Sequence, residues 1–426
     1  MNSFVPSCLC VRLFAVVSLL TVSCPSAPGA RVEIDLNYIP KTPDAESAYP
    51  LESVGDKTAF DYFRDEGITV GWNLGNTLDA WNNGVAKETV WGNPQANEAI
   101  FAGVKAAGFN IVRVPVTWMG HIGPAPDYHI EEAYLKRVAE VVGYAKKAGF
   151  KVIVNLHHDG STASSGRDNG WLSINSARGS EEGYRKVTMQ YIRVWKQIAT
   201  YFKNYGDWLI FESLNEVHDG GWGWSAETAS QYDIVNEWNQ FFTHTVRGAG
   251  ANNETRFLLY NGYCATARHA LSGNFALPSD SAQNRQIVSF HYYDPHEFGI
   301  VGDGRGGRPD WGSDQDKAKV VNDFGQFKAK FINNNIPVII GESGAVRQQY
   351  VNDKAKEDRA RQARLEYVAW VYAQAAQNGL VPVYWDNGLF SGNGEKFGLF
   401  DRATGKVNSD ESEAVVRAMM GAVRAK

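Results

Sequence analysis

Eight short apolar runs recur along the chain, and longer segments with a helical pattern separate them. The runs are rich in Val and Ile and are apolar on both faces, as 111–114 and 338–340 illustrate. Strands of a parallel sheet that is covered on both sides have this composition. The eight runs are Thr69–Leu74, Asn110–Val116, Lys151–Leu156, Leu209–Leu214, Arg256–Tyr260, Ile287–Tyr292, Pro337–Gly341 and Val381–Trp385.

The segments between the runs carry apolar residues at helical spacing. Gly108, Gly149 and Gly379 each follow such a segment, at the place where a left-handed glycine commonly ends a helix. Eight strand–helix units in about 350 residues predict an α/β fold, a single (β/α)8 TIM barrel. The alternative is an open doubly wound sheet, but no glycine-rich phosphate loop opens the series. The clearest helical segments are Glu131–Ala148, Glu182–Phe202, Ala355–Gln377 and Glu411–Val423.

The N-terminus has the pattern of a secretory leader. An apolar run at 13–22 follows Arg12 and is too short to span a bilayer as an ordinary transmembrane helix. Small residues follow it, which predicts cleavage between Ser23 and Ala30. Residues 20–24 also resemble a bacterial lipoprotein signal, which would anchor the chain to the cell surface through Cys24. We expect a signal peptide at 1–30, an N-terminal lead-in at 31–50 and one domain at 51–426.

Charge and cysteine content exclude several classes of protein. The formal net charge of -5 argues against a nucleic-acid partner, because phosphate binding needs a basic face. Of four cysteines only Cys264 lies outside the leader and lead-in, so no intrachain disulfide is expected in the processed chain. A lone thiol is more often a small buried hydrophobe than a nucleophile. No long exposed apolar stripe stands out, and we expect a monomer.

Polar and aromatic side chains gather where the predicted strands end, which is the active-site face of a (β/α)8 barrel. Glu216 follows the fourth run and Glu342 the seventh, each between an apolar strand and solvent. Paired carboxylates are the working groups of glycoside hydrolysis. The other strand-end candidates are Asn73, Asn76, Arg113, His157, His158, Asn215, His291, Tyr293, Trp385 and Asn387, with Asn261 and Tyr263 as weaker ones.

Each candidate also has a purely structural interpretation. Arg113 could be a buried ion-pair residue, or its charge could lower the pKa of a neighbouring carboxyl. His157, His158 and Asp159 could form a metal site by composition. Neighbouring residues of a strand point to opposite faces, so both histidines can face the barrel axis only if the strand has already ended. A serine hydrolase is disfavoured, because no G-x-S-x-G elbow precedes a helix.

Seven motifs together resemble glycoside hydrolase family 5, a cellulase family, over nearly the whole chain after the leader. The first and third motifs look most like its subfamily 4, which is rich in endo-β-1,4-glucanases and xyloglucanases. The motifs are Gly71–Asp79, Arg113–Pro115, Asn155–His158, Leu214–Glu216, His291–Tyr293, Gly341–Glu342 and Trp385–Gly388.

This resemblance implies a retaining hydrolase with Glu216 as general acid/base and Glu342 as nucleophile. It implies no metal and no cofactor. We further expect Arg113 and Tyr293 to hold Glu342 ionised, and negative charge with partial burial to keep Glu216 protonated, with His291 adjusting its proton. The residues that match the family pattern in supporting or sugar-binding positions are Arg113, His157, Asn215, His291, Tyr293 and Trp385.

The sequence therefore predicts a secreted, retaining endo-β-1,4-glucanase whose partner is a β-glucan such as cellulose, mixed-linkage β-glucan or xyloglucan. A xyloglucan-specific enzyme and a β-mannanase are the alternatives within the family. A non-catalytic carbohydrate-binding barrel is disfavoured, because both glutamates are present. Trp222 and Trp224 lie among glycines after the fourth run and are expected to stack on sugar rings. Asn73, Asn76, His158 and Asn387 are further candidates for substrate binding.

Overall fold

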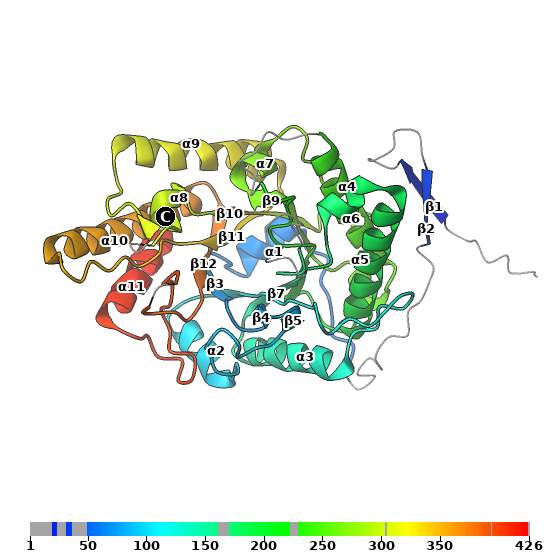
Figure 1. Cartoon of the computed structure of the whole chain (residues 1–426), viewed down its shortest axis with the longest axis horizontal. Coiled ribbons are helices and arrows are strands. Elements are labelled where there is room, and N and C mark those ends of the chain that lie inside the picture. Colours follow the sequence, from blue (N-terminus) through cyan, green and yellow to red (C-terminus); the bar gives the residue numbers. More distant parts are fainter. Residues whose placement is uncertain are drawn as a thin grey trace, which may run out of the picture.

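Eight parallel strands close into a barrel in the order β10-β11-β12-β3-β6-β7-β8-β9, and helices surround it (Figure 1). This confirms the predicted (β/α)8 barrel and excludes the open sheet. The computed structural model describes residues 19–23, 31–35, 49–160, 170–221, 229–302, 305–392 and 394–424. The barrel strands are β3 Gly71–Leu74, β6 Ile111–Val114, β7 Lys151–Asn155, β8 Leu209–Glu212, β9 Leu258–Thr266, β10 Gln286–Tyr292, β11 Val338–Ser343 and β12 Leu380–Asp386.

The four clearest predicted helices are all present, with ends within two residues of the expected ones. Gly108, Gly149 and Gly379 have φ values of 108°, 81° and 77°, which confirms their left-handed conformation. The helices are α1 Ala59–Asp65, α2 Glu98–Ala106, α3 Glu132–Lys147, α4 Ile174–Gly179, α5 Glu181–Tyr201, α6 Ala229–Arg247, α7 Ala267–Leu271, α8 His296–Gly299, α9 Asp314–Lys330, α10 Lys354–Gln377 and α11 Asp410–Arg424.

The smaller elements lie outside the barrel wall. Two antiparallel pairs, β1 Leu19–Ser23 with β2 Arg31–Asp35 and β4 Trp81–Asn82 with β5 Val85–Ala86, complete the described strands. Two short 3-10 helices lie at Ala251–Glu254 and Ile332–Asn334. None of the described helices is both long enough and apolar enough to cross a membrane.

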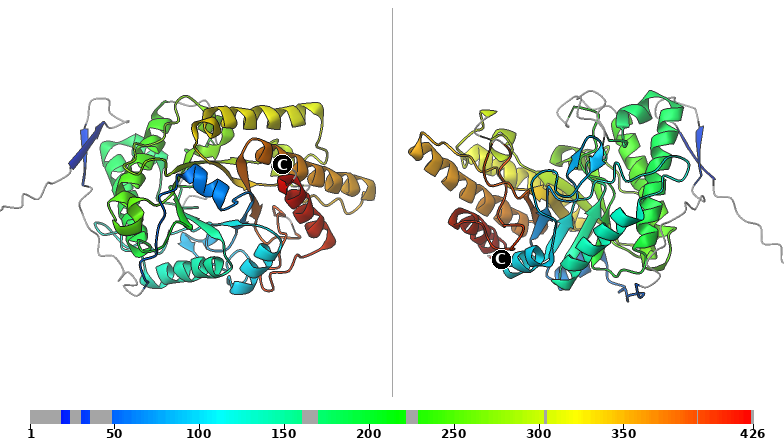
Figure 2. Two further views of the ribbon diagram at one scale, coloured as in Figure 1. Left: turned by 180° about the vertical axis from the view of Figure 1, so that it is seen from behind. Right: turned by 60° about the horizontal axis from the view of Figure 1, so that its bottom comes forward.

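The inside of the barrel is built in layers, because side chains alternate between the two faces of each strand. The lower layer is apolar, and α1 packs against it through Ala59, Tyr62 and Phe63. Figure 2 shows α1 lying across the rear of the barrel, at the N-terminal ends of the strands. The strand residues of this layer include Ile111, Ile153, Ile210, Leu259, Ile287, Ile339 and Val381.

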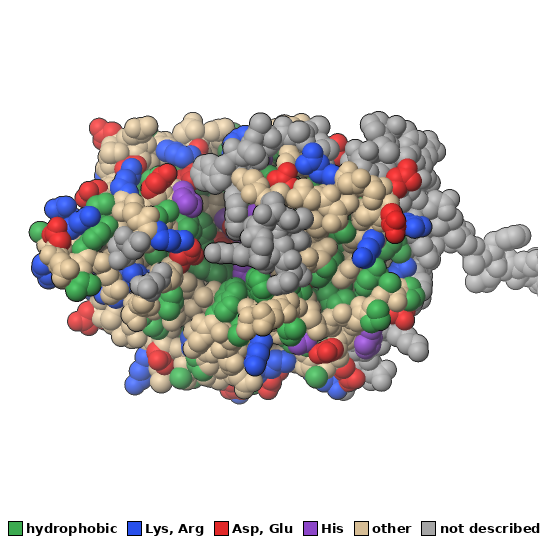
Figure 3. Space-filling view, viewed as in Figure 1, with side chains coloured by type: hydrophobic (Ala, Val, Ile, Leu, Met, Phe, Trp, Pro, Cys, Tyr) green, Lys and Arg blue, Asp and Glu red, His purple; other side chains and the backbone are tan. Residues whose placement is uncertain are grey.

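A polar layer lies two residues further along the strands. Arg113, Asn155, Glu212 and Asn261 follow the apolar layer on β6, β7, β8 and β9, and all four are fully buried. The apolar layer therefore closes one end of the barrel, and the polar layer forms the floor of the other. Figure 3 views the molecule from the same side as Figure 1 and shows a central hollow with acidic and histidine side chains among apolar ones.

Candidate active site

Arg113 lies at the centre of the polar floor and contacts residues from several strands of the barrel. Its Nε donates to Glu212 at 2.7 Å, and its terminal nitrogens donate to Glu342 at 2.8 Å and to Asn215 at 2.7 Å. A further bond of 3.1 Å reaches Asn73 Oδ1. The guanidinium thus makes one contact with each of four groups, an arrangement that only the planar fork of arginine supplies.

Glu342 ends the apolar part of β11 and lies between a cation and a phenol. Arg113 donates to its Oε1, and the Tyr293 hydroxyl donates to its Oε2 at 3.0 Å. The preceding residue, Gly341, has to be glycine, since an added Cβ would lie 2.7 Å from Ser289 Oγ and 3.3 Å from His291 Nε2. The lack of a side chain there lets His291 approach Glu342 from the neighbouring strand.

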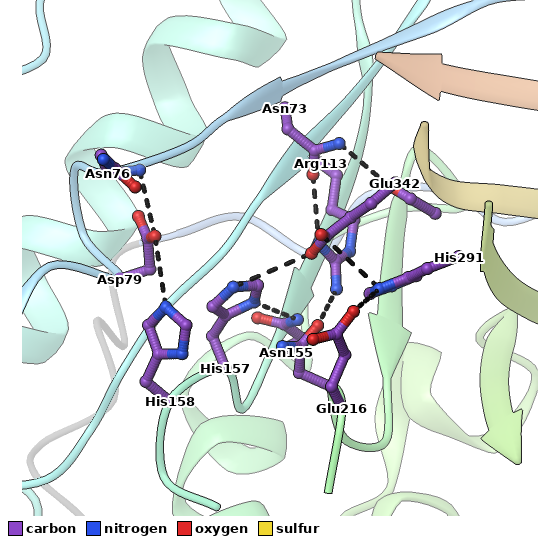
Figure 4. Close-up of polar contacts among 12 residues, drawn as sticks. Asn73, Asn76, Asp79, Arg113, Asn155, His157, His158, Glu216, His291 and Glu342 are labelled. Atoms are coloured by element: carbon purple, nitrogen blue, oxygen red, sulfur yellow. Dashed lines mark hydrogen bonds and ion pairs between the residues drawn. The ribbon is translucent and has the colours of Figure 1, made fainter. Parts of the chain in front are cut away.

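Glu216 lies beyond the end of β8 and approaches Glu342 from the opposite side of the hollow (Figure 4). Its Oε1 lies 2.6 Å from His291 Nδ1, and the same nitrogen lies 3.5 Å from Glu342 Oε2. One carboxylate oxygen of Glu216, one of Glu342 and this imidazole all lie within 4.8 Å of one another. The side chain of Glu216 is 29% exposed and that of Glu342 is 7% exposed, so Glu216 lies nearer the solvent.

The protonation pattern differs from the one that the sequence led us to expect. Burial raises the pKa of Glu342, against the opposing charges of His291 and Arg113. Burial also acts on Glu216, but the hydrogen bond and charge of His291 outweigh it and lower the pKa of Glu216. The pKa of His291 is raised, because the charges of Glu342 and Glu216 outweigh the effect of its burial. The 2.6 Å contact between His291 Nδ1 and Glu216 Oε1 therefore holds one proton between the two groups.

His157 faces Glu342 as a neutral ring in a defined tautomer. Asn155 accepts a bond from Val116 N–H at 3.1 Å, so its amide nitrogen must face Glu212 and His157 Nδ1, at 3.0 and 3.2 Å. Because Nδ1 is then an acceptor, the ring proton lies on Nε2, which is 3.8 Å from Glu342 Oε1. Burial lowers the pKa of His157 well below its ordinary value, which agrees with a neutral ring.

The aromatic wall of the hollow includes Trp385 and Trp91. The Trp385 ring lies parallel to His157 with centroids 5.7 Å apart, and Gly75 permits this position because a Cβ there would lie 2.9 Å from the indole. Trp91 is 38% exposed, and its Nε1–H donates to Trp81 O at 2.9 Å. Its ring lies 5.5 Å from His158, so His158 and Trp91 form the rim on this side.

Two groups in the described part of the chain have the composition of a metal site. One is Asp79, His157 and His158, and the other is Glu216, His291 and Glu342. β7 ends at Asn155, before the two histidines, so both do approach the hollow. Asp79 accepts the backbone N–H groups of Asn76 and Thr77 at 3.0 and 2.7 Å. Since Asp79 and His157 Nδ1 already accept protein hydrogen bonds, the first group fits a hydrogen-bond network better than an ion.

Most of the residues expected at strand ends meet in one hollow, and two of them, Asn73 and Asn387, bond other parts of the protein. Asn73 is fully buried, and its amide bonds Arg113, Gly341 O and Tyr384 O. Asn387 accepts from Leu389 and Phe397 N–H and donates to Glu395 O. Both amides bond the protein itself, and their contact with substrate stays a prediction.

Of the other residues expected to contact sugar, Asn76 lies in the described part of the chain, whereas the two tryptophans of the glycine-rich segment do not. Asn76 lies at the rim with a left-handed backbone, φ 55°. Trp222 and Trp224, which were expected to face the substrate, lie outside the described residues.

Sequence reasoning missed the part of the site that lies below the rim. Glu212, Asn155 and Asp79 are fully buried, and Glu212 bonds both Arg113 and Asn155. Asn261, expected only as a weaker candidate, donates to Glu212 Oε1 at 2.7 Å. A signal was present in the alternation along β8, where Ile210 and Glu212 must share the inward face.

The fold and the carboxylate pair at the C-terminal ends of its strands define the class of protein, a (β/α)8-barrel glycoside hydrolase. A family model described as cellulase (glycosyl hydrolase family 5) matches residues 75–391. The chain belongs to this family and is a hydrolase of the endo-β-1,4-glucanase type, which confirms the resemblance and the activity that the sequence predicted.

Similar proteins support this assignment. The cellulase/esterase CelE of Acetivibrio thermocellus is 37% identical over 357 residues, which are 83% of this chain and 39% of CelE. The chain thus spans well under half the length of that relative. The xyloglucan-specific endo-β-1,4-glucanase BoGH5A of Bacteroides ovatus is 34% identical over 82% of this chain and 68% of its own. The structure of a GH5-4 broad specificity endoglucanase from Bacteroides salanitronis superposes with a TM-score of 0.77 at 39% identity, covering 89% of this chain and 99% of that one.

Proposed function

We propose that this protein cleaves the backbone of β-1,4-glucans by double displacement, with Glu342 as nucleophile and Glu216 as general acid/base. The observation that carries the proposal is the spacing of the two carboxylates, whose nearest oxygens lie within 4.8 Å. Retaining glycosidases hold this pair about 5 Å apart, whereas inverting ones leave a wider gap for water. Arg113 and Tyr293 orient both oxygens of Glu342 for attack on the anomeric carbon.

In the first step Glu342 attacks the anomeric carbon while a proton passes to the leaving oxygen. The proton shared by His291 and Glu216 serves this purpose, because a sugar bound over the hollow excludes water and favours the neutral acid of Glu216 over an ion pair. The bond from the anomeric carbon to the leaving oxygen breaks as its bond to Glu342 forms. The products of this step are a glycosyl ester of Glu342 and a free chain end.

In the second step water replaces the ester. Glu216 gave up its proton in the first step, and because the ester of Glu342 carries no charge, Glu216 stays ionised and can act as base. It takes a proton from the incoming water, whose oxygen bonds the anomeric carbon as the bond from that carbon to Glu342 breaks. Asn215, fixed by its bond to Arg113, lies beside Glu216 where the sugar 2-hydroxyl would pass. Trp385 and Trp91 would support the sugar rings on the non-reducing side of the cleavage point.

For the substrate, we propose a broad range of unbranched and branched β-1,4-glucans. The similarity to a broad specificity endoglucanase and to a xyloglucan-specific one supports this range. Residues 1–30 are proposed as a secretory signal and 51–426 as the catalytic domain, with anchoring through Cys24 as the alternative to release. The protein is proposed to act as a monomer outside the cell.

A polysaccharide panel tests the substrate range. Release of reducing ends should be measured on carboxymethyl cellulose, barley β-glucan, xyloglucan and galactomannan. We expect activity on the first three and at least tenfold less on galactomannan. Activity confined to xyloglucan would make the enzyme xyloglucan-specific, and activity highest on galactomannan would make it a β-mannanase. The Glu342→Gln variant is the matched control and should be inactive on all four.

A further inference from the structure

A third carboxylate, Glu212, lies directly below the candidate pair and takes part in neither step of the reaction. Its side chain is fully buried at the end of β8. Its Oε2 accepts from Arg113 Nε at 2.7 Å and from Asn155 Nδ2 at 3.0 Å. Its Oε1 accepts from Asn261 Nδ2 at 2.7 Å. Glu212 is thus held by residues from the strands on both sides of its own.

Burial of the Glu212 carboxylate costs folding free energy, so its presence calls for a reason other than stability. Arg113 carries one positive charge and bonds two carboxylates, Glu212 at 2.7 Å and Glu342 at 2.8 Å. Its charge would be balanced by Glu342 alone. The three groups together carry a net charge of about -1 in a dry interior, where an apolar side chain of similar shape is often as stable or more stable. The position of Glu212 therefore suggests a role in the reaction rather than in folding.

The contacts of Glu212 determine how Arg113 and His157 are oriented beside Glu342. Its bond to Arg113 Nε fixes the plane of the guanidinium, so that one terminal nitrogen reaches Glu342 and the other reaches Asn215. Its bond to Asn155 holds the amide nitrogen toward His157 Nδ1. This contact keeps the proton of His157 on Nε2, the nitrogen that faces Glu342.

We propose that Glu212 is a positioning residue for this reaction, which orients Arg113 and His157 beside Glu342 and whose negative charge raises the pH at which Glu342 ionises. The inference rests on the proposed role of Glu342 as nucleophile. It adds a group that does not touch the substrate and acts on Glu342 by orienting Arg113 and Asn155 and by its own charge.

Other ionisable groups also face Glu342. These groups come from five elements of the barrel and remain unchanged when Glu212 is replaced by glutamine. Glu212 and Glu342 bond the same guanidinium, so removal of the negative charge of Glu212 lowers the pKa of Glu342, by about one unit at an effective dielectric constant of about 20. The groups are Asp79 after β3, Arg113 on β6, His157 after β7, Glu216 after β8, His291 on β10 and Tyr293 just after it.

The Glu212→Gln variant should fold, because the surrounding amides can adapt. The new side-chain oxygen can still accept from Arg113 and Asn155. Its new amide group would face Asn261, whose Oδ1 has no hydrogen-bond partner in the described part of the chain. Rotation of the Asn261 amide would turn that oxygen toward the new donor.

The test is the pH profile of kcat/KM on 2,4-dinitrophenyl β-cellobioside for the full chain and three variants. For Glu212→Gln we expect the acidic limb to move to lower pH by about one unit, with a fall in kcat of about tenfold or more. For Glu212→Asp, which keeps the charge but shortens the side chain, we expect the fall in kcat with the acidic limb in place. The matched control is Asp280→Asn, which breaks a buried bidentate pair with Arg247 at the other end of the barrel and should leave the profile unchanged.

Two results would overturn the inference. If the acidic limb of Glu212→Gln lies at the same pH as in the wild type, the charge of Glu212 does not affect Glu342. If Glu212→Asp keeps the wild-type kcat, Glu212 does not position the neighbouring side chains. If Glu212→Gln does not fold, Glu212→Asp alone decides, with wild-type kcat as the contradicting result. A wild-type enzyme without activity on this substrate would instead refute the proposed function, so the two failures are distinguishable.

Discussion

Replacement of Arg113 by lysine should damage both stability and catalysis, although it keeps the positive charge. The guanidinium serves four acceptors, on Glu212, Glu342, Asn215 and Asn73. A lysine ammonium is a single point with three donors and reaches about two of them. About two buried acceptors then lose their partner, at about 1–3 kcal/mol each. The free energy of unfolding should therefore fall by about 2–6 kcal/mol.

Catalysis should suffer separately from stability. Arg113→Lys leaves Glu342 charged but no longer fixed, and a displacement of about 1 Å at the reacting group costs about 100-fold in rate. Urea unfolding followed by fluorescence gives the stability, and initial rates on an aryl β-cellobioside give kcat for the fully folded fraction. Arg113→Lys should thus lose about 100-fold in kcat at urea concentrations where it is folded.

Arg256 offers the matched control, because it is equally buried but lies at the N-terminal end of the barrel. Its guanidinium donates to Asn253 Oδ1 at 2.7 Å and to the carbonyl oxygens of Leu209 and Tyr205 at 2.8 Å each. Arg256→Lys should lower stability by a similar amount and leave kcat within about twofold. The reasoning fails if Arg113→Lys keeps the wild-type kcat, or if Arg256→Lys loses as much kcat as Arg113→Lys.

Three further predictions follow from burial and exposure. Because burial raises the pKa of Glu342 above its ordinary 4.5, kcat/KM should fall as the pH drops through a value above 4.5, and an acidic limb below 4 would contradict this. Trp91→Ala should raise KM on long β-glucan about threefold to tenfold through lost stacking and leave rates on aryl cellobioside unchanged. Trp91→Phe, which keeps an aromatic ring, should have a KM close to that of the wild type. A chain that begins at Val32 has Cys264 as its single cysteine. Because burial raises the pKa of this thiol, it should react with Ellman's reagent only in urea. Rapid reaction of the folded protein would show that Cys264 is accessible.

The barrel could be predicted from the sequence because its signal is local. Runs such as 338–340 are apolar on both faces, and Gly149 and Gly379 end helices in a conformation that depends on the residue itself. The end of β9 was missed, since the strand continues to Thr266 through Cys264 and Ala265, both with left-handed backbones, φ 53° and 48°. No apolar alternation marks that segment.

The site was predictable in its membership but not in its contacts. Glu212 and Arg113 are 99 positions apart and meet only when the barrel closes. Burial and nearby negative charge were expected to raise the pKa of Glu216, but a 2.6 Å contact with His291 lowers that pKa. Asn387 was expected to bind substrate, but the turn that follows it engages both ends of its amide.

Azide rescue of the two glutamate variants tests the central claim, the division of roles between Glu216 and Glu342. Each alanine variant is incubated with 2,4-dinitrophenyl β-cellobioside and sodium azide, and the anomeric configuration of the cellobiosyl azide is read by proton NMR. Glu216→Ala should still form the glycosyl ester, so azide attacks it and gives the β-azide. Glu342→Ala should give the α-azide, because azide fills the space of the nucleophile and displaces the leaving group directly. An α-azide from Glu216→Ala together with a β-azide from Glu342→Ala would contradict the account.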